Sequence, residues 1–306
     1  MVDVTVIICA HNPHRPFLQR VIEALKGQTL DRNLWELILV DNGSKEPICT
    51  WCDLSWHPMG ICVSEPELGL ASARRRGISQ GRGSLVVFVD DDNVLASDYL
   101  ERAYRIAREW PRLGAWGSGS ISAEFEIEPA LHLKPFLGFL GVREVAQPVW
   151  SNAISCTDAT PIGAGLCIRR DVADAYMKFY EESKIKISGR KGTALGAHED
   201  YEICYLACQA GLGMGIFPEL RILHLIVKKR VSDAHILRLI EGVTSSHCIL
   251  DYKWKGKVPS SPYSAHGLAS LVLNIFRRRG FDRRVFFAEL RAVNAARRTL
   301  FQLQKE

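Results

Sequence analysis

Long hydrophobic runs are missing from this sequence of 306 residues. No apolar stretch approaches the roughly 20 residues that a membrane-spanning helix needs, and the first apolar segment, which begins at Val4, follows no basic leader. A strong charge of one sign is also missing, since the formal net charge is +5 and the pI is about 8.7. Composition therefore indicates neither a nucleic-acid-binding protein nor an integral membrane protein, and we expect a cytoplasmic location.

Cysteine is present in an odd number, nine, and several of these residues lie in apolar runs. This pattern is typical of a reduced intracellular chain with buried thiols. Cys49 and Cys52 form a C-x-x-C pair, but no second pair follows at the spacing of a zinc site, so a metal or redox role is a minor alternative. The 47% of apolar residues suffices for a sizeable core, in one large α/β domain or two smaller ones.

Strand and helix patterns alternate along the first third of the chain. Strands are predicted where β-branched and apolar residues run together, at 4–10, 35–40, 60–64 and 85–89. Apolar residues at helical spacing predict helices at 17–25 and 70–78. This alternation predicts an α/β fold with a mostly parallel sheet covered on both faces. The polar residues that follow three of the strands should converge on one crevice at the strands' carboxyl ends.

Glycine-rich phosphate loops are missing as well. The turn after the first predicted strand reads Ala10-His11-Asn12-Pro13-His14-Arg15 and holds no glycine, which argues against a nicotinamide-binding Rossmann domain. No Walker A motif is present either. A nucleotide would therefore be held by side chains and a metal ion rather than by a glycine cradle.

Three consecutive carboxylates, Asp90, Asp91 and Asp92, follow the strand predicted at 85–89. Like charges packed together repel each other unless a cation or hydrogen-bond donors offset them. Oxygen ligands select Mg²⁺ or Mn²⁺, and Mg²⁺ is usually held by one or two carboxylates together with substrate phosphates. The triplet therefore predicts a divalent metal and a phosphate-bearing substrate. The alternative is an acidic turn that caps the helix beginning near Leu100.

Four short segments resemble, in order and spacing, family 2 glycosyltransferases of the GT-A fold. They lie at 6–12, 39–44, 69–74 and 88–92, and the resemblance extends over roughly residues 4–224. It implies a metal ion, Mn²⁺ or Mg²⁺, at Asp92, and a sugar contact at Asp91. It also implies that the nucleotide is bound by Ala10, His11, Asn12, Asp41, Arg74 and Asp90. His11 stands where the family often has Tyr, and an imidazole can still stack on a base.

Two further segments carry the same resemblance. Gly163, Ala164 and Gly165 resemble a strand whose backbone approaches the transferred sugar, and a tight turn without a ligand is the alternative. His224 lies in an apolar strand pattern where family members sometimes place a metal-ligating His, although a buried core His is the alternative. The basic run 228–230 that follows either meets a diphosphate or lipid phosphate, or lies in water.

His198, Glu199 and Asp200 precede an apolar pattern of helical spacing that ends near Gly211. Both carboxylates are therefore expected in the first turn of a helix, where a favourable interaction with the helix dipole is one interpretation. The family resemblance implies another, in which Asp200 is the base that accepts the acceptor hydroxyl's proton. Glu199 would then orient donor or acceptor, with His198 close to the sugars.

The last 30 residues are basic. From 277 to 298 eight arginines alternate with apolar residues, and Phe286, Leu290 and Val293 share one helical face. Such a helix can lie on the anionic inner face of a membrane as a peripheral contact, or pack its apolar face on the preceding domain. The irregular stretch 122–158 is interpreted equally as a lid or acceptor-facing surface, or as a packed apolar excursion.

These patterns together predict a GT-A (Rossmann-like) domain over residues 1–230 and a helical, basic C-terminal extension over 231–306. The predicted reaction is inverting transfer of a sugar from a UDP- or dTDP-linked donor to a hydroxyl of a cell-surface or lipid-linked glycan. One alternative is a sugar-1-phosphate nucleotidyltransferase, whose N-terminal glycine-rich loop is absent. The other is a non-catalytic subunit that binds a nucleotide sugar. The sequence makes no prediction of sugar, linkage or oligomeric state.

Overall fold

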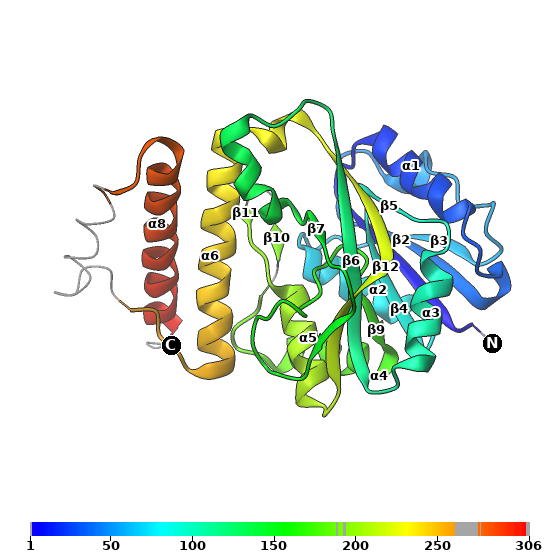
Figure 1. Cartoon of the computed structure of the whole chain (residues 1–306). Coiled ribbons are helices and arrows are strands. Elements are labelled where there is room, and N and C mark those ends of the chain that lie inside the picture. The colour runs from blue at the N-terminus through cyan, green and yellow to red at the C-terminus, as the bar shows by residue number, and fades with distance from the viewer. Residues whose placement is uncertain (1, 188, 192–193, 261–274, 276, 304–306) are drawn as a thin grey trace.

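One long mixed β-sheet organises the computed structural model, which describes all residues except 1, 188, 192–193, 261–274, 276 and 304–306 (Figure 1). Across the sheet the strands follow the order β3 (Gly60–Ser64), β2 (Trp35–Asp41), β1 (Val4–Ala10), β4 (Leu85–Asp90), β9 (Cys167–Arg169), β6 (Leu113–Phe125), β12 (Gly213–Ile226) and β5 (Asn93–Leu95). Two short strands, β7 (Arg143–Glu144) and β8 (Val149–Ser151), pair with β6 and β12. The strands β10 (Arg190–Lys191) and β11 (Ala194–Leu195) form a separate hairpin.

Parallel pairing joins β3, β2, β1 and β4, as the sequence predicts. Antiparallel pairing begins at β9, which lies between β4 and β6, and only β6 and β12 are again parallel among the described strands. The predicted α/β class is confirmed, with a sheet that is parallel in its first half and mixed in its second. The register places Ala10 beside Asp41 and Cys9 beside Asp90, so three strand ends meet at one edge, as expected.

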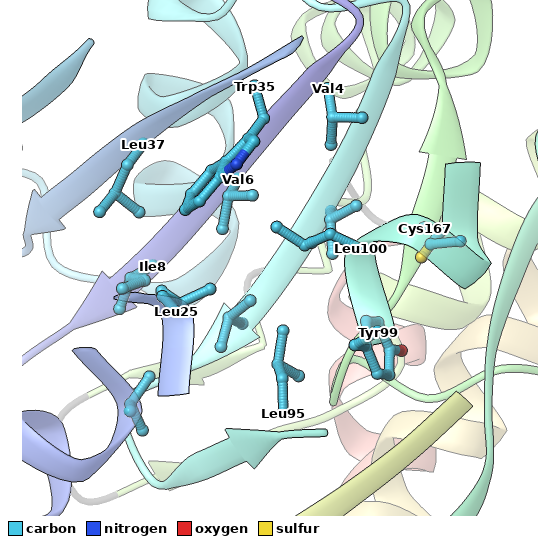
Figure 2. Close-up of a cluster of buried hydrophobic side chains, with 14 of the residues drawn as sticks. Val4, Val6, Ile8, Leu25, Trp35, Leu37, Leu95, Tyr99, Leu100 and Cys167 are labelled. Carbon is cyan, nitrogen blue, oxygen red and sulfur yellow. The ribbon is translucent and has the colours of Figure 1, made fainter. Parts of the chain in front are cut away.

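Helices cover both faces of the parallel half. One face is covered by α1 (Arg15–Lys26) and α3 (Tyr99–Glu109), and the other by α2 (Leu70–Gln80), α4 (Arg170–Glu182) and α5 (Glu199–Gln209). Figure 2 shows Val4, Val6 and Ile8 of β1 in the first core, while the intervening Ile7 belongs to the second. A fully buried aliphatic side chain contributes about 1.5–3 kcal/mol, and burial on both faces explains the uninterrupted apolar runs of these strands.

Two segments in the second half of the chain hold more structure than the sequence analysis predicts. The apolar strand pattern around His224 belongs to one long strand, β12, whose register with β6 shifts between Phe217 and Arg221. The stretch 122–158 starts inside β6 and then holds a 3₁₀ helix, Leu131–Leu140, followed by β7 and β8. Leu133 and Leu140 are buried, whereas Phe139 is 38% exposed, so this helix both packs on the protein and presents apolar surface.

The expectation of reduced thiols is wrong for one pair of cysteines. Cys49 is bonded to Cys62, across a Cα–Cα distance of 5.5 Å. Cys49 belongs to a short 3₁₀ helix, Ile48–Thr50, that the fold places beside β3, a proximity that the spacing of cysteines along the chain does not reveal. Among the described residues the remaining cysteines are free.

Two long helices, α6 (Asp233–Lys255) and α8 (Gly280–Leu303), lie side by side at the end of the molecule away from β3 (Figure 1). The predicted C-terminal helix is confirmed, but its buried face is not the predicted one. Phe286, Leu290 and Val293 are only half-buried, and the seam toward α6 consists of Val285, Ala288, Ala292, Ala296 and Leu300. Small alanines let the two helices approach closely, which a search for large apolar residues overlooks. No helix in the described residues is long and apolar enough to cross a membrane.

Candidate functional site

A cavity of about 620 Å³ opens at the carboxyl ends of β1 and β4. Its walls come from α2, from the start of α5, from the 3₁₀ helix Leu131–Leu140 and from α6. Most of the predicted site residues line it: Ala10, His11, Arg74, Asp90, Asp91, Asp92, Gly163, Ala164, His198, Glu199, Asp200 and His224. The lining holds five carboxylates and three guanidinium groups, so its acidic groups outnumber its fixed positive charges.

Three predicted site residues lie outside the cavity lining. The carboxylate of Asp41 accepts hydrogen bonds from the backbone N–H groups of Ser44 and Ile48, at 3.0 and 2.9 Å. Asn12 ties the same loop to the first strand, with its side-chain oxygen accepting from the Lys45 N–H at 2.9 Å. Both side chains therefore shape the loop after β2, and neither lines the cavity.

Gly165, the third, is a packing position. Its φ of +70° suits glycine, and a Cβ there would lie 2.2 Å from the Tyr99 hydroxyl, which donates a 2.7 Å hydrogen bond to the Gly165 carbonyl. The sequence correctly marked a backbone constraint here, but its cause is the approach of a buried tyrosine. Gly163 and Ala164 are the members of this segment that reach the cavity.

Arg74 and Glu199 form a buried ion pair between α2 and α5. Arg74 Nη1 donates to Glu199 Oε1 at 3.0 Å, and the side chains are only 2% and 5% exposed. Burial, together with the Asp200 charge, raises the pKa of Glu199 to about 7 although Arg74 opposes the rise. Burial alone would lower the pKa of Arg74, but Glu199 and Asp90 raise it above its ordinary value, so the guanidinium keeps its charge.

Asp200 is held by backbone donors at the start of α5. Its Oδ2 accepts a hydrogen bond from the Gly163 N–H at 2.7 Å, and its Oδ1 accepts from the N–H of Tyr201 at 2.9 Å. The free donors of a helix N-terminus favour an ionised carboxylate. The first turn of α5 thus fixes the Asp200 carboxylate in the cavity and buries the adjacent Glu199 carboxylate against Arg74.

His198 precedes α5 in a left-handed conformation with φ of +77°, which non-glycine residues rarely adopt. It is 5% exposed, burial lowers its pKa to about 4, and its Nδ1 has no hydrogen-bond partner among the described atoms. Backbone strain of this kind is concentrated at functional sites. Here it turns the chain so that the first residues of α5 face the cavity.

The three carboxyl groups at the end of β4 differ in the direction of their pKa shifts, because their surroundings differ. Burial raises the pKa of Asp90, although Arg74 opposes the change. Burial and the adjacent charges of Asp92 and Asp90 raise the pKa of Asp91 to about 8. Burial would raise the pKa of Asp92 too, but His224 and Arg230 hold it well below its usual range. Asp92 is therefore the member of the triplet whose ionised form the surroundings favour most.

Asp92 and His224 present a donor pair that fits a divalent cation. The imidazole Nδ1 lies 2.9 Å from the Leu140 carbonyl oxygen, which only accepts, so Nδ1 carries a proton, and in a neutral ring Nε2 then holds the lone pair. That Nε2 lies 3.3 Å from Asp92 Oδ2. Within the described residues no group of three or more His, Cys, Asp or Glu could hold a metal, so a cation bound by this pair would need its other ligands from substrate oxygens and water.

Several cavity residues were missed by the sequence analysis or given no definite role. Arg190 of β10 lines the cavity and acts electrostatically on all three aspartates of the triplet. Arg230, which the sequence left between phosphate contact and solvent, is 11% exposed and bonded to Asp92. Asn42 accepts the Gly69 N–H at 2.9 Å and so joins the β2 loop to α2. Only Asn42 had a local signal, since it lies within one of the family-like segments.

Comparison with known proteins agrees with this geometry. Residues 5–149 match the family model for glycosyl transferase family 2. The chain resembles glycosyltransferase AglE of Haloferax volcanii, with 29% identity over 102 residues that make up 32% of this chain and 33% of that protein. An uncharacterized glycosyltransferase of Haemophilus influenzae is 24% identical over 198 residues, 65% of this chain and 59% of that protein. The chain thus covers less than two thirds of the length of these relatives.

Solved structures share the fold along nearly the whole chain. The mannosyltransferase PcManGT from Pyrobaculum calidifontis, in complex with GDP-mannose and Mn²⁺, has a TM-score of 0.57 at 20% identity and covers 96% of this chain and 73% of its own. Residues 1–349 of S. aureus TarS with UDP have a TM-score of 0.51 at 11% identity, covering 98% and 92%. These likenesses confirm the GT-A fold. Residues 5–149 are thus similar to glycosyl transferase family 2, within a chain that has the GT-A fold.

Proposed function

We propose that this protein transfers a sugar from a nucleotide diphosphate donor to a hydroxyl group of a glycan, with inversion at the anomeric carbon. The observation that carries the proposal is the placement of Asp200, whose Oδ2 is fixed by the Gly163 N–H at 2.7 Å in the cavity that also holds the acidic triplet. A base and a phosphate-facing acidic edge in one cavity are the two elements that the reaction needs.

In the proposed step the acceptor hydroxyl oxygen attacks the anomeric carbon of the donor. Its proton passes to the Asp200 carboxylate, the new glycosidic C–O bond forms, and the bond between the anomeric carbon and the phosphate oxygen breaks. The nucleotide diphosphate leaves with the electron pair of that bond. Glu199 does not take the proton, because it is paired with Arg74, and that pair instead holds the start of α5 against α2. A guanidinium at Arg74 also lies in the cavity wall, where it can stabilise phosphate charge.

Mn²⁺ or Mg²⁺ at Asp92 and His224 is part of the proposal. A divalent cation there would offset the charge that develops on the leaving diphosphate. The ionised Asp92 in the cavity lining supports this, since the phosphates of an anionic donor would otherwise approach a like charge there. The complexes of the two structural neighbours, one with GDP-mannose and Mn²⁺ and one with UDP, support a nucleotide-sugar donor. We retain UDP- or dTDP-sugars as the expected donors.

The proposed acceptor is a cell-surface or lipid-linked glycan, reached from the inner face of the membrane. The supporting feature is the outer face of α8, opposite the alanine seam, where Arg283 and Arg298 accompany Phe287 and Phe301, which are 38% and 49% exposed. Cationic and aromatic side chains on one exposed face favour peripheral contact with anionic lipid. Flotation with phosphatidylglycerol vesicles would show binding that phosphatidylcholine vesicles lack. Equal binding to both would remove this part of the proposal.

The experiment that tests the reaction measures release of nucleotide from UDP-, dTDP- and GDP-sugars with Mn²⁺ or Mg²⁺. It compares the wild type with Asp200→Asn, which removes the base and keeps the shape. Asp171→Asn is the matched control, because Asp171 also lies in the first turn of a helix and accepts the next backbone N–H at 2.9 Å, yet is exposed and outside the cavity.

Loss of a general base typically lowers the rate by about 10²–10⁴-fold. We expect that loss in Asp200→Asn with donor binding retained, and unchanged release in the control. Equal turnover in the wild type and Asp200→Asn would remove Asp200 from its role. Donor binding by calorimetry with no turnover in any protein, even with glycan acceptors added, would favour the non-catalytic subunit. Neither binding nor turnover of any donor would reject the proposal.

A further inference from the structure

Arg230 occupies the position between Asp92 and His224. It belongs to the 3₁₀ helix Lys228–Val231, directly after β12, and its side chain is 11% exposed. Its Nη1 lies 2.7 Å from Asp92 Oδ2 and 3.0 Å from His224 Nε2. One guanidinium nitrogen therefore contacts both atoms that form the donor pair for a cation.

The hydrogen positions make this contact specific. Because His224 Nδ1 donates to the Leu140 carbonyl, a neutral ring has its lone pair at Nε2, and among the described residues Arg230 is the donor that reaches it there. Arg230 thus donates to the Asp92 carboxylate and approaches the imidazole lone pair at the same time. A metal ion bound by these two atoms would need the same lone pairs, so the guanidinium and the metal exclude each other.

We propose that Arg230 is a resident cation that closes the metal position, and that binding of Mn²⁺ or Mg²⁺ requires its release. This inference rests on the metal site of the proposed function and adds a competing group to it. Arg230 supplies the positive charge that the Asp92 carboxylate needs when no metal is bound. In the protein alone, metal affinity is accordingly reduced by the stability of the Arg230 contacts.

A nucleotide diphosphate shifts this balance. Arg230 lines the cavity, so a guanidinium that leaves Asp92 can meet the phosphate oxygens of the donor, with which it makes strong charge-assisted hydrogen bonds. The diphosphate also supplies ligands that the protein lacks, since the described residues offer the metal a pair rather than a full shell. Metal and nucleotide should therefore bind cooperatively, each raising the affinity for the other by the same factor.

The release would be communicated to the C-terminal helices. Arg230 and the buried Val231 lead into α6, and Leu140, whose carbonyl orients His224, packs in the same apolar cluster as Val231 and Ile236 of α6. The segment that carries the competing cation and the residue that orients the metal-facing imidazole thus share one core. Exchange of Arg230 for a metal ion would therefore affect this core at two places, through the segment that carries Arg230 and through Leu140.

The test is calorimetric titration of Mn²⁺, with and without UDP, into the wild type, Arg230→Met and Arg230→Lys. Met keeps much of the side-chain volume without charge, and Lys keeps a charge that lacks the planar fork of the guanidinium. The control is Arg221→Met, because Arg221 of β12 is 58% exposed and lies 3.8 Å from Asp98 rather than at the site. Circular dichroism establishes that each variant is folded.

Without UDP, we expect Arg230→Met to bind Mn²⁺ at least about tenfold more tightly than the wild type, which is a change of about 1.4 kcal/mol. We also expect UDP to strengthen Mn²⁺ binding less in Arg230→Met than in the wild type, with Arg230→Lys between them and Arg221→Met unchanged. Equal or weaker Mn²⁺ binding by folded Arg230→Met overturns the inference.

Asp92→Asn separates this inference from the proposed function. If it abolishes Mn²⁺ binding while Arg230→Met leaves the affinity unchanged, the metal site stands and only the competition fails. If Asp92→Asn binds Mn²⁺ as the wild type does, the metal lies elsewhere and both fail. Absence of Mn²⁺ binding by every protein, with UDP present, also overturns both.

Discussion

Replacing Arg74 by Met should destabilise the protein by an amount that grows with pH. The variant leaves Glu199 buried without its cationic partner, and loss of one member of a buried ion pair typically costs about 3–5 kcal/mol. Glu199 has a way to reduce this cost, because burial already raises its pKa to about 7. At low pH it becomes protonated and no unpaired charge is left in the interior.

The sign follows from linkage. A carboxyl group whose folded-state pKa exceeds its ordinary value of 4.5 stabilises the fold fully below pH 4.5, and that stability is lost as the pH rises through the folded pKa. In the wild type the stabilising contribution of Glu199 is therefore lost between pH 4.5 and about pH 7. Since Arg74 lowers the pKa of Glu199, its removal extends the loss above pH 7. The stability difference between wild type and Arg74→Met should then increase by up to about 1.4 kcal/mol per pH unit.

Urea unfolding followed by tryptophan fluorescence at pH 6, 7, 8 and 8.5 measures this difference. The double variant Arg74→Met/Glu199→Gln is the control, because it has no carboxyl group to titrate and should show a constant offset across this range. The reasoning is refuted if the destabilisation by Arg74→Met is the same at pH 6 and pH 8.5. It is equally refuted if the double variant shows the same growth with pH.

Two further predictions concern single positions. Gly163→Ala places a Cβ 2.2 Å from Arg74 Nη2. Because this guanidinium is buried and ion-paired, the clash should cost about 1–3 kcal/mol and lower nucleotide release. Gly27→Ala, whose Cβ would lie 3.7 Å from its nearest neighbours, serves as the packing control, and wild-type stability and turnover in Gly163→Ala would contradict the geometry. Burial and Arg32 lower the pKa of His57 to about 4, so its contribution to stability is complete above pH 6.5 and is lost as the pH falls toward 4. His57→Phe should therefore lose less stability than the wild type between pH 6.5 and 4, by up to about 3 kcal/mol, and identical acid unfolding curves would count against this assignment.

The parallel half of the sheet could be predicted because its strands are buried on both faces. Runs such as 4–10 and 85–89 contain hardly a polar residue, and the carboxylates that end the second run stand out against it. The site was predictable for the same reason, since charge at the end of a buried strand needs a cause. Glu199 and Asp200 were visible because an apolar helical pattern begins directly after them.

What the sequence could not supply depends on contacts between distant segments. The carboxylate of Asp41 is occupied by its own loop, and whether a carboxylate faces a ligand or a backbone N–H is decided by loop geometry. Arg230 was indistinguishable from its neighbours Lys228 and Lys229 until the fold buried it against Asp92. The helix α6 was predicted only as part of a helical extension over 231–306, without bounds of its own, because its 23 residues mix polar and apolar positions on a surface shared by several partners.

That shared surface decides where the chain could be shortened. Leu239 and Val243 on one side of α6 line the cavity, while Asp233 and Glu241 pair with arginines of α8 on another. A truncation at residue 230, the boundary suggested by composition, would remove a wall of the cavity together with the extension. A truncation after Lys255 would keep this wall of the cavity. It would expose the face of α6 that the alanine seam of α8 now covers, so we expect it to lower solubility before it affects catalysis.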